Sequence, residues 1–332
     1  MVQPILQIED LHTHFFTDRG EIPAVDGVNL YVKSGEVLGV VGESGCGKSV
    51  TSLSVLKLIP QPPGKIVGGR IFFKGNDIVP LKEREMRYIR GNSISMIFQE
   101  PMTSLNPLFT VGQQIGETVR LHRGLSRKEA REHTVEMLIK VGIPRPEAVI
   151  DDYPHQLSGG MRQRVMIAMA ISCSPELLIA DEPTTALDVT IQAQILDLIR
   201  RLNEENGTAV MLITHDLGVV AEMCHRVAVM YAGRVVEEGC VRDIFKNPLH
   251  PYTQGLIQSV PRMNEQRKRL FSIPGNVPIL STQMKGCRFS DRCPHTMPIC
   301  LEQIPRLEEH EAEAAHSCRC WLYQTPQEEV AQ

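Results

Sequence analysis

A glycine-rich stretch early in the chain has the residue types and spacing that bind phosphate. The residues Gly42-Glu-Ser-Gly-Cys-Gly-Lys48-Ser49 fit the pattern G-x-x-x-x-G-K-[ST] in full. In this pattern backbone N–H groups surround the phosphate oxygens, the lysine reaches the β- and γ-phosphates, and the hydroxyl binds Mg²⁺. The sequence therefore predicts a nucleotide site, to which it assigns Gly42, Glu43, Ser44, Gly45, Cys46, Gly47, Lys48, Ser49 and Val50.

Two neighbouring acids supply the second part of such a site. The apolar run Leu177–Ala180 ends in Asp181 and Glu182. An aspartate at a strand end can hold Mg²⁺, usually through water, and the next carboxylate can orient and deprotonate an attacking water. Together with the phosphate loop, these acids predict hydrolysis of a nucleotide rather than binding alone.

Strands and helices alternate around these motifs. Buried parallel strands are predicted for three short apolar runs, Val37–Val41, Leu177–Ala180 and Ala209–Ile213. Helical spacing follows in Ser49–Leu58 and again in Ile191–Leu202. This alternation predicts an α/β protein with a mostly parallel sheet.

Other segments have equally clear local patterns. The chain is predicted to be helical from Pro107 to about Ile171, and Ser126-Arg-Lys-Glu129 has the layout of a capping box that opens one helix. Arg226–Glu238 predicts two strands joined at Ala232-Gly233. Residues from about 262 onward are loop-like and then rich in cysteine, so we expect a small module there. The phosphate loop is expected to lie in a core separate from that module.

Composition excludes several classes of protein. The chain has 332 residues, of which 42% are hydrophobic and 22% charged, which is enough for one large domain or two. The net charge of −4 argues against nucleic acid as a partner, because nucleic-acid binders usually carry a basic patch. The longest uncharged apolar stretch, Val165–Pro175, is shorter than the roughly 20 residues that a membrane helix needs.

A third motif gives a second phosphate-binding helix start. In Leu157-Ser158-Gly159-Gly160-Met-Arg-Gln163-Arg164, the serine is a natural N-cap and the glycines let the backbone approach an anion. This segment resembles the signature of ATP-binding-cassette (ABC) ATPases, which completes the ATP site of an opposite subunit. The resemblance assigns further site residues in the expected order: Gln99 to the Q-loop, Ala186-Leu187-Asp188 to the D-loop, His215 to the switch that contacts the γ-phosphate, and Phe15 or Phe16 to the adenine stack.

Two segments indicate a branch of that family. Gln99-Glu-Pro-Met-Thr-Ser-Leu-Asn-Pro107 and Asn247-Pro-Leu-His-Pro-Tyr-Thr253 resemble oligopeptide and dipeptide importer ATPases, as does the tail 263–332. The resemblance implies ATP and Mg²⁺ as ligands, a homologous second ATPase subunit in a heterodimer, two membrane-spanning permease subunits and an extracytoplasmic peptide-binding protein. It also implies a peripheral position at the cytoplasmic face of the membrane.

Five cysteines crowd the C-terminal region. Cys287, Cys293 and Cys300 are followed by Cys318 and Cys320. The first residues, Met1-Val2-Gln3-Pro4, lack the layout of a secretory signal, so we expect a reducing compartment and a four-thiolate metal site rather than disulfides. The site suits Zn²⁺ or a [4Fe–4S] cluster, and resemblance to peptide-importer ATPases favours the cluster. Cys320 is favoured as the fourth ligand, with Cys318 as the alternative.

The resemblance thus implies a P-loop NTPase ABC cassette of the α/β class, with a RecA-like core, an antiparallel β subdomain and a helical subdomain at about 103–170. The cassette is expected at 1–261 and the cysteine-rich module at 262–332. The expected function is ATP hydrolysis that powers uptake of di- or oligopeptides. The alternative is a soluble ABC ATPase acting on nucleic acid or ribosomes. The solute stays open between peptides, nickel and a glycoside, because a cassette never touches it.

Overall fold

The computed structural model describes residues 3–18, 20–99, 104–185, 188–260, 271–310 and 315–324. The chain divides into two compact units, each with its own share of the candidate site residues. Unit 1 comprises Met1–Leu6, Tyr31–Val37 and Phe72–Ile213, and unit 2 comprises Gln7–Leu30, Leu38–Ile71 and Thr214–Gln332.

Parallel strands form the centre of unit 1. β6 (Ile94–Ile97), β7 (Leu177–Asp181) and β8 (Ala209–Ile213) pair in parallel in that order. Every residue of the three strands is buried, as expected for parallel strands covered on both faces. α8 (Val189–Asn206) connects β7 to β8 in the chain. These elements confirm the predicted strands at the two acids and at Ala209, and the predicted helix between them.

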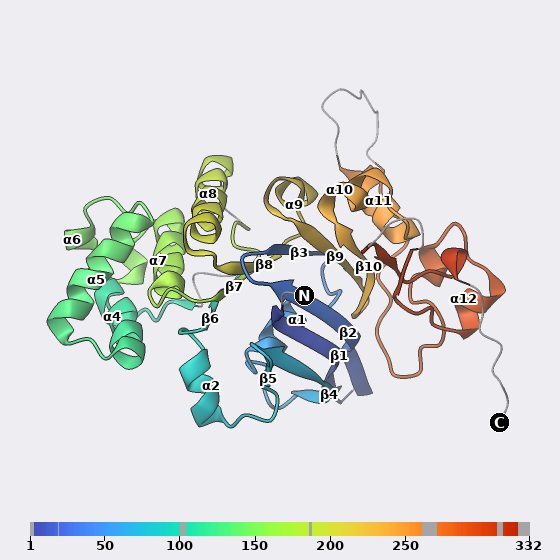
Figure 1. Cartoon of the computed structure of the whole chain (residues 1–332), viewed down its shortest axis with the longest axis horizontal. Helices are drawn as coiled ribbons and strands as arrows, with labels where there is room; N and C mark the ends of the chain where they lie inside the picture. The colour runs from blue at the N-terminus through green and yellow to red at the C-terminus, as the bar shows by residue number, and fades with distance from the viewer. Residues whose placement is uncertain are drawn as a thin grey trace. The chain divides into compact units, whose positions relative to one another are not determined.

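A helical group follows in the same unit, where four helices lie together (Figure 1). They are α4 (Val111–Arg123), α5 (Arg127–Lys140), α6 (Pro146–Val149) and α7 (Gly159–Ile171). The predicted capping box is confirmed, because the Ser126 hydroxyl accepts from the Glu129 N–H at 3.3 Å while the Glu129 carboxylate accepts from the Ser126 N–H at 2.8 Å. Unit 1 also contains β5 (Asn76–Asp77), α2 (Glu83–Ile89) and the 3-10 turn η1 (Pro154–Gln156).

A mixed sheet organises unit 2. Its strands are β3 (Val37–Val41, from Leu38 on), β9 (Arg226–Tyr231), β10 (Arg234–Cys240), β11 (Glu308–Glu309) and β12 (Ser317–Cys318). β3 pairs with β9 in parallel, whereas β9–β10, β10–β12 and β12–β11 are antiparallel. The predicted strand pair with a turn at Ala232-Gly233 is therefore confirmed.

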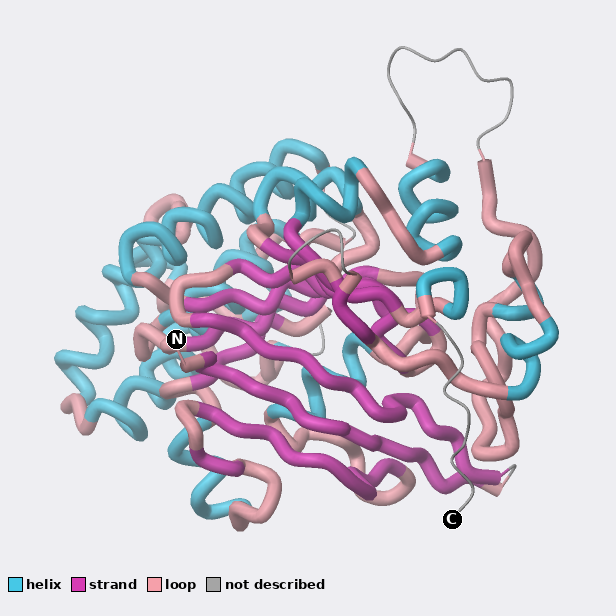
Figure 2. Tube along the Cα trace, turned by 45° about the vertical axis from the view of Figure 1, so that its right-hand side comes forward, coloured by secondary structure: helices cyan, strands magenta, loops and turns pink. Residues whose placement is uncertain are grey.

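A second group of strands is long and runs as extended magenta tubes (Figure 2). β1 (Pro4–Thr17) lies between β2 (Gly20–Lys33) and β4 (Gly64–Phe73). Most residues of these strands belong to unit 2. Alternation of buried and half-exposed residues along β1 shows one face in the core and one face outside it.

Short helices complete unit 2. They are α1 (Lys48–Val55), α9 (Leu217–Met223), α10 (Val241–Lys246), α11 (Pro251–Ser259), η2 (Ser290–Arg292), α12 (Pro298–Glu302) and η3 (Trp321–Tyr323). Tyr231, Tyr252 and Phe289 join the C-terminal segments to β9, with ring centroids 4.6 to 5.5 Å apart. Because this core also includes Val41 of β3, the expectation that the phosphate loop lies in a separate core is wrong. No helix among the described residues is long and apolar enough to cross a membrane.

A buried histidine in this core makes stability depend on pH. Burial lowers the pKa of His250 to about 4, and its Nδ1 accepts a 3.1 Å hydrogen bond from the Tyr252 N–H, which requires a neutral ring at that nitrogen. The unfolded value is about 6.5, so the unfolded chain binds the extra proton first. We expect full stability above pH 6.5 and a loss of up to about 3 kcal/mol as the pH falls to about 4.

Urea unfolding between pH 7.5 and 4 measures this dependence. In His250→Asn the side-chain oxygen can still accept from the Tyr252 N–H, but the side chain at this position no longer titrates. The free energy of unfolding should therefore change less with pH than in the wild type. The exposed His155→Asn is the control and should keep the wild-type slope. Equal slopes for His250→Asn and the wild type would contradict the assignment.

Candidate nucleotide-binding and hydrolysis site

The phosphate loop of unit 2 joins β3 to α1 through residues that must be glycine. Gly42 has φ of +153°, and a Cβ there would lie 2.2 Å from the Met230 carbonyl oxygen. Gly47 has φ of +102°, and its Cβ would lie 2.5 Å from the Ala24 carbonyl oxygen. Any side chain at either position would push the loop away from the strands beneath it.

The lysine of this loop is buried and folded back on the loop itself. Lys48 Nζ donates to the carbonyl oxygens of Gly42 at 2.7 Å and of Glu43 at 3.1 Å. No side chain caps the N-terminus of α1, which begins at Lys48. An ammonium group and the start of a helix therefore face the same loop, as phosphate binding requires.

The predicted switch histidine also lies in unit 2. His215 is exposed in the segment between β8 and α9. Its neighbours are fixed, because the Thr214 N–H donates to the Val40 carbonyl at 3.2 Å and the Asp216 side chain caps α9 through the N–H of Gly218 at 2.8 Å. The histidine is thus presented between two anchored residues.

Unit 1 brings two predicted catalytic residues together. Gln99 Nε2 donates to Glu182 Oε2 at 3.1 Å, and the Thr185 hydroxyl donates to the same oxygen at 2.8 Å. Asp181 ends β7 and is buried. Glu182 has a φ of +47°, a conformation that costs energy for a residue with a side chain and is frequent at functional sites.

The signature segment begins α7 in unit 1. Ser158 is the N-cap and its hydroxyl accepts from the Met161 N–H at 3.3 Å, while Gly159 and Gly160 form the first turn. The Gln163 side chain is buried and donates to the Pro183 carbonyl at 2.6 Å, which ties α7 to the residues after β7. Ser158 and Gly159 are exposed, so this helix start is open to a partner.

Some predicted positions are only partly described. Asp188 caps α8 by accepting from the Ile191 N–H at 3.0 Å, whereas Ala186 and Leu187 of the D-loop lie outside the described residues, as do residues 100–103 of the Q-loop. Phe16 is 50% exposed and Phe15 is half-buried. The choice between these two rings for adenine stays a prediction.

Four of the five C-terminal cysteines surround one cavity in unit 2. Cys287, Cys293, Cys300 and Cys320 line it, and Cys318 does not. The hydrogen bond that the two thiols share lowers the pKa of Cys320 to about 7, and this bond together with burial raises the pKa of Cys318. Of the two candidate fourth ligands, Cys320 therefore has more thiolate character.

Another group of potential metal ligands escaped the sequence patterns. His12, His14 and Asp26 each offer an atom within 4.8 Å of the others. Arg234 bonds the Asp26 carboxylate at 2.8 Å and Arg288 bonds it too, and these contacts lower the pKa of Asp26 against the opposing effect of burial. Two guanidinium groups on the only carboxylate of the group make it an ion-pair network rather than a cation site.

Comparisons with known proteins place the chain in a family. The ABC transporter family model matches residues 25–185, and the model for the oligopeptide/dipeptide transporter C-terminal region matches residues 236–300. The dimeric structure of MJ0796, a bacterial ABC transporter cassette, is similar with a TM-score of 0.65 and 30% identity over 71% of this chain and 99% of that chain. The same cassette is known in a post-hydrolysis state bound to ADP and Pi, with the same TM-score of 0.65.

Curated relatives give the same result over nearly the whole chain. A probable peptide ABC transporter ATP-binding protein of Sinorhizobium fredii is 57% identical over 96% of this chain and 94% of its own. The dipeptide transport ATP-binding protein DppD of Bacillus subtilis is 50% identical over 97% and 95%. The chain therefore belongs to the ATP-binding proteins of ABC transporters. Within that class it belongs to the oligopeptide/dipeptide transporter branch.

Proposed function

We propose that this chain is the ATP-binding and ATP-hydrolysing subunit of an importer for di- or oligopeptides. The observation that carries this proposal is the combination of a phosphate loop and an acid pair with a match to the oligopeptide/dipeptide transporter C-terminal region. The relatives are ATP-binding proteins of peptide transporters, so they favour this function over a soluble ATPase acting on nucleic acid or ribosomes. The cassette spans about 1–261 in this proposal, with the C-terminal module at 262–332.

Within this function each site residue has a chemical task. Lys48 and the N–H groups of the loop bind the β- and γ-phosphates, and His215 contacts the γ-phosphate. Ser49, Asp181 and Gln99 offer oxygen ligands, which suit Mg²⁺, an ion that would neutralise phosphate charge. Glu182 accepts a proton from the attacking water, because it is the carboxylate next to the Mg²⁺ ligand and the side chain of Gln99 orients it.

The signature implies that two cassettes share each ATP. Ser158, Gly159 and Gly160 are placed at an exposed helix start and would close the site of a second, homologous ATPase subunit. The MJ0796 cassette forms a dimer, which supports this arrangement. The heterodimer would lie at the cytoplasmic face of the membrane beneath two permease subunits, fed by an extracytoplasmic peptide-binding protein.

This composite site predicts that the isolated subunit hydrolyses ATP poorly. Adding the second ATPase and the permeases should raise turnover, and peptide-loaded binding protein should raise it further, whereas nucleic acid should not. Ser158→Ala should lower turnover of the complex by at least tenfold, because it removes one charge-assisted hydrogen bond to the nucleotide bound by the partner.

Ser126→Ala is the matched control for this variant. Ser126 caps α5 with the same 3.3 Å bond that Ser158 makes at α7, so both variants lose about 1 kcal/mol of helix capping. Only Ser158→Ala should affect turnover. Full activity from a strictly monomeric preparation would refute the composite site.

The cysteine cavity supports a [4Fe–4S] cluster more than zinc. A tetrahedral Zn²⁺ holds its sulfurs at about 2.3 Å, which places them only about 3.8 Å apart. Among the described histidines, cysteines and acids, the only three ligand atoms within 4.8 Å of one another belong to the His12 group, so zinc would require the thiols to move closer together than a larger cluster does. A cluster held by Cys287, Cys293, Cys300 and Cys320 would supply the folding energy that so small a module lacks.

A further inference from the structure

The C-terminal region contacts the phosphate loop directly. Arg292, the last residue of η2, donates from Nη1 to Glu43 Oε2 at 2.7 Å and from Nη2 to Glu43 Oε1 at 3.1 Å. The Glu43 N–H donates to the Tyr252 hydroxyl at 2.8 Å. Glu43 is the second residue of the loop, so both its side chain and its backbone are fixed by residues that follow β10 in the chain.

The arginine itself is held rigidly. Its side chain is 4% exposed, and Nε donates to the Pro274 carbonyl at 2.8 Å. The guanidinium carbon lies 5.8 Å from the centre of the Tyr231 ring and 6.0 Å from that of Phe289. A bidentate hydrogen bond from a buried, preorganised guanidinium to a carboxylate is among the strongest polar contacts in proteins, so it fixes where the Glu43 side chain lies.

A second connection reaches the middle of the same loop. The Gly233 N–H donates to the Cys46 carbonyl at 2.9 Å. The preceding Ala232 carbonyl accepts from Arg288 of the C-terminal region. The loop is therefore fixed at its start and at its middle. The first connection involves Arg292, which precedes Cys293, and the second involves Arg288, which follows Cys287.

We propose that Arg292 and Tyr252 are positioning residues for the phosphate loop, and that the affinity for ATP depends on a folded cysteine module. The N–H groups of the loop bind phosphate only while the loop keeps its shape. Loss of the module's fold releases Glu43 and lets the start of the loop move. This inference rests on the proposed ATP site and adds a coupling between that site and the cysteines.

A double-mutant cycle on the full chain tests the coupling. Glu43→Gln keeps the shape of the side chain but removes the charge, and Arg292→Lys keeps the charge but loses the two-pronged bond. Each should weaken ATP binding, measured by calorimetric titration, by about tenfold, within the 5–150-fold range usual for coupled sites. The double variant should bind no more weakly than either single one, because both remove the same contact.

Arg319→Lys is the matched control. Arg319 also lies beside a cavity cysteine, but it donates to the carbonyls of Val235 and Pro305 and not to the loop. It should bind ATP as the wild type does. Arg292→Lys could unfold the module, which would be seen as a lower melting temperature. In that case the ATP affinity of Glu43→Gln tests the positioning role, since this variant leaves the C-terminal region unchanged.

The outcomes separate this inference from the proposed function. Wild-type protein that fails to bind ATP would overturn the function. A different result would overturn the positioning role alone. In that result the wild type binds ATP, Lys48→Ala abolishes binding, and Glu43→Gln and Arg292→Lys both keep the ATP affinity within twofold of wild type. Additive losses in the double variant would also overturn it, because the two residues would then act separately.

Discussion

Replacement of Glu182 by glutamine is expected to lower ATP turnover of the assembled transporter by about 10²–10⁴-fold while ATP still binds. Glutamine has the same shape and can still meet the Gln99 and Thr185 side chains, which lie 3.1 and 2.8 Å from Glu182 Oε2. It cannot accept a proton from water. Asp181 and Ser49 are unchanged in this variant, so the proposed Mg²⁺ ligands stay in place. Turnover and ATP affinity are measured on the same preparation.

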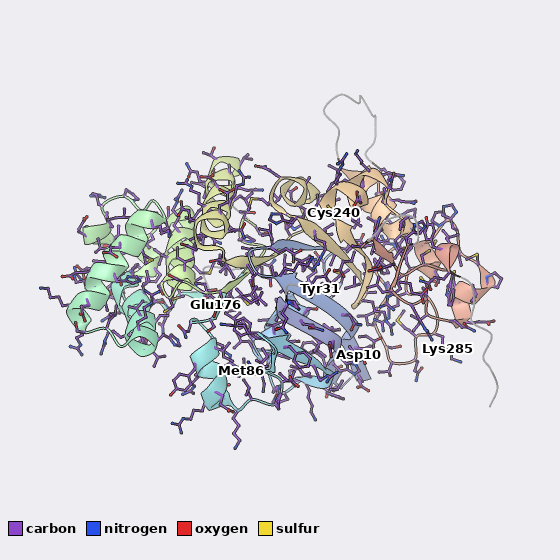
Figure 3. The ribbon with its side chains drawn as sticks, viewed as in Figure 1. Asp10, Tyr31, Met86, Glu176, Cys240 and Lys285 are labelled. Atoms are coloured by element: carbon purple, nitrogen blue, oxygen red, sulfur yellow. The ribbon has the colours of Figure 1, made fainter. Side chains whose placement is uncertain are left out.

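Glu176→Gln is the control for this change. Glu176, labelled in Figure 3, immediately precedes β7 and forms an exposed ion pair with Lys74 at 2.7 Å. The same chemical change at the opposite end of the same strand should leave turnover within twofold. Turnover of Glu182→Gln within a few-fold of wild type would show that another group takes the proton.

The parts of the fold that the sequence predicts are those whose signal is local. β7 and β8 are buried on both faces, so β8 and β7 as far as Ala180 are continuous apolar runs that can be recognised without their neighbours. The capping box at Ser126 and the turn at Ala232-Gly233 are likewise specified by a few adjacent residues. The phosphate loop also belongs to this class, because consecutive residues from Gly42 to Ser49 make up its whole motif, although its glycines are required by the distant carbonyls of Met230 and Ala24.

The contacts that the sequence does not predict join residues far apart in the chain. Arg292 and Glu43 are 249 positions apart, and neither has a pattern that names the other. The arginine lies beside a cysteine cluster and the glutamate lies inside a phosphate loop, and neither motif indicates that its charged residue has a distant partner. The two residues meet in the core where Tyr231, Tyr252 and Phe289 pack, so a local analysis separates the cysteine module from a loop that it contacts.

The choice between Cys318 and Cys320 has the same origin. Both follow similar spacing, but Cys318 pairs with Glu237 of β10 in the sheet, whereas Cys320 precedes η3 and lines the cavity. A strand pairing between residues about 80 positions apart decides which sulfur faces the other three. Spacing alone contains no information about it.

Serine substitutions of the cysteines are therefore expected to fall into two groups. Cys287→Ser, Cys293→Ser, Cys300→Ser and Cys320→Ser should each remove the bound iron, about four atoms per chain for a [4Fe–4S] cluster, and loosen the residues after about 280. Cys318→Ser should keep iron, because its side chain is buried outside the cavity. Iron and acid-labile sulfide are measured on anaerobically purified protein.

The two neighbouring cysteines form the sharpest comparison, since both are buried and both lie in the segment 315–324. A non-specific effect of serine in this segment would act on both variants alike. Because Arg292 precedes Cys293 and holds Glu43, Cys320→Ser should also weaken ATP binding, whereas Cys318→Ser should not. Retention of iron by Cys320→Ser with its loss in Cys318→Ser would reverse the assignment of the fourth ligand. Stoichiometric zinc without sulfide in the wild type would replace the cluster by a four-thiolate zinc site, and the predicted link to ATP binding would still be tested by the same pair.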